Sequence, residues 1–152
     1  MRSSLVFTML MVVLAGCAGV ESNAQLDNCP QPRFTGKAPQ SFLEMTNAVV
    51  ANNANIAAGE KLYQSGIKPV SCAQCHGRKG DGKGPMSAMF EPPPRNFTCA
   101  QTINNVPDGQ LFWIIQNGST GTSMPGFNQL SQTEIWQIVM YIRQLANGHG
   151  PS

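Results

Sequence analysis

Residues 72–76 read Cys-Ala-Gln-Cys-His, a pair of cysteines three positions apart with a histidine directly after the second. C-x-x-C-H is the attachment signature of c-type haem. The spacing suits that chemistry because two thiols on one short helical turn can add to the two vinyl groups of a single haem, and the next imidazole then faces the iron. The motif predicts one covalent haem held by Cys72 and Cys75, with His76 as an iron ligand.

Two other kinds of site use paired cysteines. A zinc ion needs four ligands, and beyond the motif only His149 and two distant cysteines, Cys29 and Cys99, remain to complete such a set. A thioredoxin-like redox pair is typical of a βαβ setting, and no alternating strand pattern is visible in the chain. We therefore favour haem over zinc and over a dithiol redox site.

The N-terminus has the pattern of a secretory signal peptide over residues 1–16. It combines a short positive start (MR), a ten-residue apolar stretch at 5–14 and small residues (AG) at a cleavage site. The alternative is an uncleaved membrane helix, but the apolar run ends near Val20, short of the roughly 20 residues that span a bilayer. We predict export, which also favours haem because c-type haem is attached outside the cytoplasm.

The stretch Leu14-Ala15-Gly16-Cys17 resembles the lipobox of bacterial lipoproteins, in which the cysteine is acylated and becomes the new N-terminus. The resemblance implies a bacterial periplasmic protein anchored to a membrane by lipid at Cys17. Several acyl chains meet the requirement of more than one chain for stable anchoring. Ala18 after the cysteine, rather than aspartate, favours the outer over the inner membrane. Ordinary cleavage, with Cys17 incidental, is the alternative.

Composition limits the size and the partners of the protein. A chain of 152 residues is one domain by the usual size range. Only 12% of the residues are charged and the net charge is +2, so the sequence lacks the basic stripe that neutralises phosphates, and we exclude nucleic acid as a partner. The 15 glycines and 11 prolines indicate long loops.

Two cysteines remain after the motif and the lipobox, Cys29 and Cys99. In an exported chain an unpaired thiol is exposed to oxidation, so a disulfide between them is the economical prediction. It would close a loop of about 71 residues and destabilise the unfolded chain by about 4 kcal/mol. Two unrelated free thiols, or an intermolecular bond, are the alternatives.

Residues 17–53 form a polar, irregular extension. As a flexible linker it would reach roughly 30 Å, enough to lift a small domain clear of a lipid surface. Its apolar residues Phe34, Phe42, Leu43 and Met45 could instead pack onto the domain, which would make the extension an ordered wrap. The sequence leaves both interpretations open.

Apolar periodicity predicts three helices, at 55–64, 107–117 and 131–146. The last begins with Ser131 and Glu134, a capping box. Between the first two lies a long segment, 67–106, without clear periodicity. A stretch of that length counts against a compact domain unless something fills the space beside it, and a haem would fill it.

Residues 55–146 resemble a class I, monohaem cytochrome c. The resemblance rests on the order and spacing of the helix with Gly59 and Tyr63, CAQCHG, GTSMPGF and the helix with Trp136 and Tyr141. It implies an all-α cytochrome c fold, with three main helices and long loops around one covalently attached haem c. We assign this domain to 54–147 and a tail to 148–152. In that fold the first and last helices cross closely, which would set Gly59 against Trp136 or Tyr141.

The resemblance also assigns roles to residues. Cys72 and Cys75 attach the haem, His76 is the proximal ligand, and Met124 in the loop between the last two helices is the distal ligand. The other candidates for that position are Met45, Met86, Met89, Met140 and His149. Arg95, in the stretch PPPRNF, is where the family aims a cation at a haem propionate; a solvated loop charge is the alternative.

His/Met ligation leaves no vacant iron site, so the resemblance implies a one-electron carrier and not an enzyme. The expected partners are redox proteins, donor and acceptor, and the membrane through the lipid, with no small-molecule substrate. We therefore expect a periplasmic, membrane-tethered carrier that moves electrons between respiratory or other redox enzymes. One alternative is a haem protein with an open or labile sixth site for a small ligand or peroxide. Another is a fixed subunit of an oxidoreductase.

Overall fold

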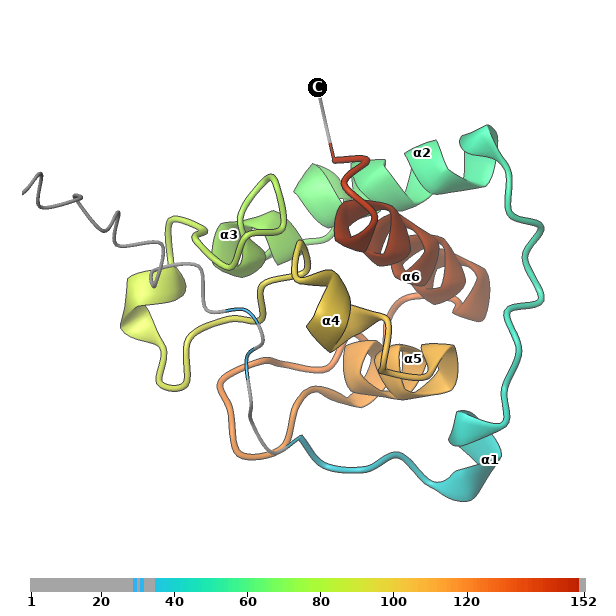
Figure 1. Cartoon of the computed structure of the whole chain (residues 1–152), viewed down its shortest axis with the longest axis horizontal. Coiled ribbons are helices and arrows are strands. Elements are labelled where there is room, and N and C mark those ends of the chain that lie inside the picture. The colour runs from blue at the N-terminus through green and yellow to red at the C-terminus, as the bar shows by residue number, and fades with distance from the viewer. Residues whose placement is uncertain (1–28, 30, 32–34, 151–152) are drawn as a thin grey trace, which may run out of the picture.

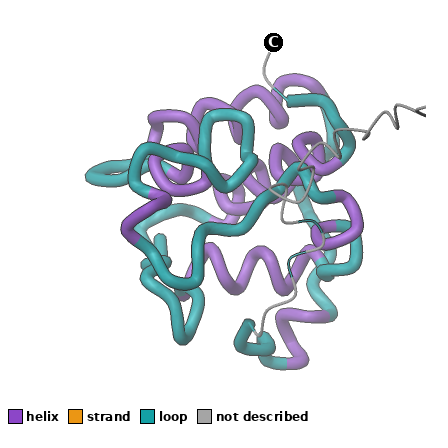
Figure 2. The backbone as a smooth tube through the Cα atoms, turned by 60° about the vertical axis from the view of Figure 1, so that its left-hand side comes forward, coloured by secondary structure: helices purple, strands orange, loops and turns teal. Residues whose placement is uncertain are grey.

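The computed structural model describes residues 29, 31 and 35–150. The signal peptide predicted at 1–16 and the lipidation site predicted at Cys17 lie outside the described residues, as does Phe34. Within the described part the secondary structure is helical and contains no strand. The expectation of an all-α fold is therefore confirmed, and Figure 2 shows the helices joined by long loops.

Six α-helices occur in the described residues, together with one π-helical and one 3₁₀ segment. The three predicted helices correspond to α2 (Asn53–Lys61), α5 (Asp108–Asn117) and α6 (Gln132–Ala146). The short α1 (Gln40–Leu43), α3 (Cys72–His76) and α4 (Ala100–Ile103) have too few turns to show a periodicity in the sequence. The π-helix η2 (Leu62–Gly66) continues α2, and the 3₁₀ helix η3 (Ser87–Met89) lies in the long loop.

The main helices begin where side chains can cap them. Asn52 accepts a hydrogen bond from the Asn55 amide, so α2 begins two residues earlier than the sequence pattern predicted. The capping box of α6 is present, with Ser131 and Glu134 satisfying each other's backbone amides. These caps fix the starts of the two helices that cross.

Helices α2 and α6 pack across one another, and α5 packs against α6 from another side (Figure 1). A Cβ at Gly59 would clash with the backbone carbonyl of Gln137, so only glycine permits this approach. The sequence had set Gly59 against an aromatic ring; instead the glycine meets the backbone of α6. The aromatic contact falls one turn later, where Tyr63 meets Tyr141 at 5.2 Å between ring centroids.

The extension is ordered where the structure describes it. We call Cys29, Gln31 and residues 35–52 the N-terminal strap; it runs along the domain past α5 before entering α2 (Figure 1). The buried side chain of Gln110 donates to the Gly36 carbonyl and accepts from the Ala38 amide, at 2.9 and 2.8 Å. Phe42 packs on Phe112, with ring centroids 6.2 Å apart. In this region the extension therefore packs onto the domain, as the ordered-wrap interpretation predicted, and is not a flexible linker.

Candidate functional site

A large apolar cavity opens between α3, the loop that ends in Phe97, α5, α6 and the loop that carries Met124. Its volume is about 1200 Å³ with the open mouth included. Most of its wall is hydrocarbon, supplied by Ile103, Val106, Leu111, Ile114, Ile115, Phe127, Ile138 and Ile142. The functional residues named in the sequence stand around this wall: Cys72, Cys75, His76, Arg95 and Met124. Such a space suits a large, mostly apolar group.

The two thiols lie on α3, a helix that consists only of the CAQCH motif. Cys72 and Cys75 are not disulfide-bonded, and each side chain is half-buried at the cavity wall. Burial raises the pKa of the Cys72 thiol to about 12 and raises the pKa of the Cys75 thiol as well. Both sulfur atoms are therefore neutral thiols at pH 7, one helical turn apart and facing one cavity.

His76 ends this helix and is buried, with 8% of its surface exposed. Its Nδ1 lies 2.9 Å from the carbonyl oxygen of Arg95. A carbonyl only accepts, so this contact requires the proton on Nδ1 and leaves the Nε2 lone pair for a metal. Phe97 stacks on the imidazole, with centroids 4.4 Å apart and planes 16° apart. One loop therefore fixes both the tautomer and the plane of the ring.

A glycine turn secures the end of α3. Gly77 adopts a φ of 81°, and its amide donates to the Ala73 carbonyl. The Gly84 amide donates to the Cys75 carbonyl at 3.1 Å, at a point where a Cβ would overlap the backbone of α3. The buried hydroxyl of Tyr63 donates to the Gly77 carbonyl at 2.8 Å, and burial raises the pKa of this phenol far above its usual value. This turn and Tyr63 together position the motif helix.

Met124 lines the same cavity from the loop between α5 and α6. Its carbonyl accepts from the Ser119 amide at 3.2 Å, and its amide donates to the Thr122 hydroxyl at 3.2 Å. Of the methionines in the described residues, it is the one that lines the cavity. Met140 is buried in α6, Met89 is 73% exposed on η3, and His149 lies in the exposed tail. The fold thus brings Met124 and His76 to one cavity.

Arg95 contributes more to the site through its backbone than the sequence suggested. Arg95 is among the residues that line the cavity, and its guanidinium donates from Nη1 to the Gln31 carbonyl at 2.6 Å. The propionate contact stays a prediction. The main-chain carbonyl of Arg95, which faces His76, is a functional group that sequence reasoning missed. Phe97 was missed as well, because its role depends on a loop conformation that leaves no periodic signal.

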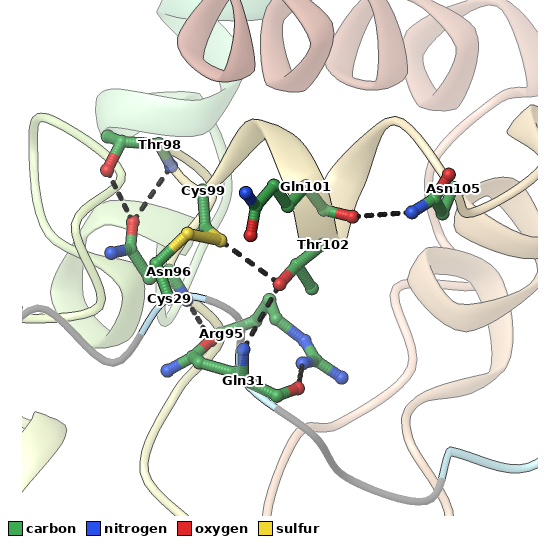
Figure 3. Close-up of a disulfide and its surroundings, with 9 residues drawn as sticks. All are labelled: Cys29, Gln31, Arg95, Asn96, Thr98, Cys99, Gln101, Thr102 and Asn105. Carbon is green, nitrogen blue, oxygen red and sulfur yellow. Dashed lines mark hydrogen bonds between the residues drawn. A yellow bond between two sulfur atoms is a disulfide. The ribbon is translucent and has the colours of Figure 1, made fainter.

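A disulfide joins Cys29 to Cys99, with Cα atoms 5.5 Å apart (Figure 3). It ties the strap to the start of α4. The two distant cysteines that a zinc site would have needed are thereby bonded to each other. In the described part of the chain, no three His, Cys, Asp or Glu side chains cluster in a way that would hold a metal ion. Likewise, no helix there is long and apolar enough to cross a membrane.

Comparison with known proteins identifies similar chains. The family model described as "Cytochrome C oxidase, cbb3-type, subunit III" matches residues 54–142. A solved chain from the "Kuenenia stuttgartiensis reducing HAO-like protein complex" is similar, with 25% identity and a TM-score of 0.56. The alignment covers 68% of this chain and 48% of that one, so this chain matches about half of its neighbour's length. A search of curated proteins finds no match.

Proposed function

The chain belongs to the cytochrome c family of cbb3-type oxidase subunit III, whose domains carry covalent c-type haem for electron transfer, and from this premise we propose a specific carrier. It is a one-electron carrier of the bacterial periplasm, tethered to a membrane, in which His76 and Met124 would bind the haem iron. It is not an enzyme. The observation that carries this proposal is that His76 and Met124 line a single apolar cavity together with both motif thiols.

The residues around the cavity fit a c-type haem. Cys72 and Cys75 would attach it, since both are free thiols on one turn of helix. His76 would bind through Nε2, because its Nδ1 is taken by the Arg95 carbonyl. Met124 would supply a thioether from a loop whose backbone is held by Ser119 and Thr122. Arg95, at the cavity wall, is the candidate for a propionate contact.

The residues also favour electron transfer over catalysis. When bound, haem iron takes up and releases a single electron. The side chains of His76 and Met124 would both bind the iron, which would leave it no ligand position for a substrate. A thioether ligand and an apolar wall both favour the reduced state and raise the reduction potential. Two ligands held by hydrogen-bonded backbone would move little when the charge changes, which suits fast transfer.

The partners would be redox proteins that dock weakly near the cavity mouth. Lipid at Cys17 would keep the domain at the membrane, the outer membrane being favoured, and raise its effective concentration near membrane-bound partners. The name of the matched family and the complex of the structural neighbour also favour a second candidate, a fixed subunit of an oxidoreductase. Size under native conditions, measured on protein extracted in mild detergent, separates a free carrier from a subunit.

A potential titration followed by visible spectroscopy tests the ligand set. The wild-type protein should show a single one-electron wave at clearly positive potential, with a red-region sulfur-to-iron band when oxidised. Met124→Ala should remove that band and lower the potential. Met89→Ala is the matched control, because Met89 lies outside the cavity and is 73% exposed. An unchanged spectrum in Met124→Ala would contradict Met124 ligation, and a wild-type protein that binds carbon monoxide would favour an open sixth site.

Membrane fractionation tests the tether. Cys17→Ala should abolish lipidation and release the protein into the soluble periplasmic fraction. A Cys17→Ala chain that still partitions with membranes would refute the lipid anchor. Because Cys17 precedes the haem domain, the visible spectrum should be unchanged in this variant, which separates the tether from the carrier function.

A further inference from the structure

Gln31, a residue of the N-terminal strap, lies next to Arg95 and Asn96 and close to the disulfide (Figure 3). Its amide donates to the Thr102 hydroxyl at 3.1 Å, and its carbonyl accepts from Arg95 Nη1 at 2.6 Å. Its side-chain oxygen Oε1 accepts from the Asn96 amide at 2.7 Å. The disulfide at Cys29, two positions earlier, anchors the strap beside these contacts.

The Asn96 amide and the Arg95 carbonyl belong to the same peptide unit. A trans peptide is planar, so its N–H and C=O point in opposite directions and turn together. At one end of this unit the carbonyl faces His76 Nδ1 at 2.9 Å; at the other end the amide donates to Gln31 Oε1. Rotating the peptide would break both hydrogen bonds. The strap and the histidine therefore hold a single peptide plane from its two sides.

We propose that Gln31 is a positioning residue for the iron ligand His76 and acts through the peptide between Arg95 and Asn96. This inference rests on the proposed function, in which His76 binds haem iron. A hydrogen bond to the amide polarises the carbonyl of the same unit and strengthens the bond which that carbonyl accepts from Nδ1. A stronger Nδ1 hydrogen bond makes the imidazole a more basic ligand. The strap thereby takes part in tuning the haem and does more than link it to the membrane.

The direction in which the reduction potential should change follows from these hydrogen bonds. A more basic imidazole stabilises the oxidised iron, so loss of the Gln31 acceptor should raise the reduction potential. The oxidised-to-reduced equilibrium should shift by a few-fold, with about tenfold, or 59 mV for one electron, as the upper end. The exchange of the His76 Nδ1 proton with solvent should become several times faster.

The test uses the full holoprotein and three variants. Gln31→Leu removes the side-chain acceptor and keeps similar size, while the backbone bonds to Thr102 and Arg95 survive because they use main-chain atoms. Gln31→Glu restores an acceptor for the Asn96 amide. Gln40→Leu is the matched control, since Gln40 lies on the same strap, is exposed and bonds Glu44. The readouts are the potential and the exchange rate of the Nδ1 proton by NMR in the reduced state.

We expect faster Nδ1 proton exchange and a raised potential in Gln31→Leu alone, and slow exchange again in Gln31→Glu. Equal exchange rates and potentials in Gln31→Leu and Gln40→Leu would overturn the proposal. If Gln31→Leu fails to acquire haem, hydrogen exchange of the Asn96 amide in the wild-type protein provides the test. Slow exchange supports the hydrogen bond from this amide to Gln31 and with it the proposal, whereas exchange at the rate of an unstructured chain refutes the proposal. Failure of Met124 ligation would be seen separately, in the wild-type spectrum, because the Nδ1 readout depends on His76 alone.

Discussion

The two sides of the cavity are built in different ways. On one side His76 is buried at the end of a helix, hydrogen-bonded by the Arg95 carbonyl and stacked by Phe97. A disulfide also fixes the start of α4 near that loop. On the other side Met124 is half-buried in a loop without regular structure, and hydrogen bonds with the Ser119 amide and the Thr122 hydroxyl hold its backbone in place.

The difference teaches where each proposed ligand would fail. On the histidine side two contacts from one loop, the Arg95 carbonyl and the stacked Phe97 ring, position the imidazole, so the loss of one leaves the other in place. On the methionine side the backbone packs tightly against α5: a Cβ at Gly118 would lie 2.7 Å from the Met124 carbonyl, and one at Gly126 would lie 2.7 Å from the Gln116 carbonyl. We therefore expect a single substitution on the histidine side to lower stability without displacing His76. A single substitution on the methionine side should displace Met124 as a ligand.

The largest effect is expected from removing the disulfide with Cys29→Ser and Cys99→Ser together. The bond spans 70 positions of sequence, so its loss should lower the free energy of unfolding by about 4 kcal/mol. Denaturant unfolding of the oxidised holoprotein measures this change. The red-region band should persist at low denaturant, because neither Cys29 nor Cys99 is among the residues that line the cavity with Met124. A decrease in the free energy of unfolding below about 1 kcal/mol would mean that the other contacts of the strap hold it on the domain without the disulfide.

Gly118→Ala should displace Met124 as a ligand and lower the free energy of unfolding by about 3 kcal/mol. Gly118 has a φ of 86° and a ψ of 176°, a conformation that other residues avoid, and the added methyl group would crowd the Met124 carbonyl. The predicted signature is a weakened or absent red-region band, with haem still covalently attached, in the visible spectrum.

Gly121→Ala is the control for Gly118→Ala. Gly121 also has a positive φ, 78°, but a Cβ there would meet nothing within 4 Å. Gly121→Ala should therefore lower the free energy of unfolding only by the conformational cost of a positive φ, about 1 kcal/mol, and should keep the red-region band. If both variants lose the band equally, crowding of Met124 is not the cause.

A smaller effect, about 1 kcal/mol, is expected from Phe97→Leu and from Phe127→Leu. Both rings are buried and line the cavity, but Phe97 alone stacks on His76. Electron paramagnetic resonance of the oxidised protein reports the orientation of the imidazole plane. It should change in Phe97→Leu and stay as in the wild type in Phe127→Leu. The reverse pattern would remove the proposed role of Phe97.

The smallest effect is expected at Glu134, remote from both ligands. Hydrogen bonds from Ser131 lower the pKa of this exposed carboxyl. A lowered folded-state pKa gives stability that is present above the usual pKa of the carboxyl and is lost as the pH falls through the lowered value. Glu134→Gln keeps the capping geometry, so at pH 7 it should cost less than about 1 kcal/mol.

Denaturant unfolding at several pH values from 7 down to 3 checks this sign. The difference between the wild type and Glu134→Gln should vanish at the acid end. Neither ligand signal should change at pH 7, which makes the variant a control for general destabilisation of α6. A difference that grows as the pH falls would contradict the assigned pKa direction.

Local patterns in the sequence determined much of this protein. The CAQCH motif predicted the haem, which the family match supports. The capping box and the apolar periodicity placed α5 and α6 nearly at their observed bounds. These features are readable because a motif's chemistry depends on spacing along the chain, and because a helix repeats its buried face every few residues.

Only the tertiary structure decided the environment of the site. It packed the strap against the domain by way of Gln110 and Phe42, and it set Gly59 against the backbone of α6. It also placed the peptide of Arg95 and Asn96 between Gln31 and His76. Apart from the Phe42 ring contact, each of these contacts uses a main-chain atom on at least one side and joins residues far apart in the sequence. Every residue carries the same main-chain atoms, so the residue type does not reveal such contacts. The sequence therefore specified the attachment motif, whereas the fold decided how its histidine is held.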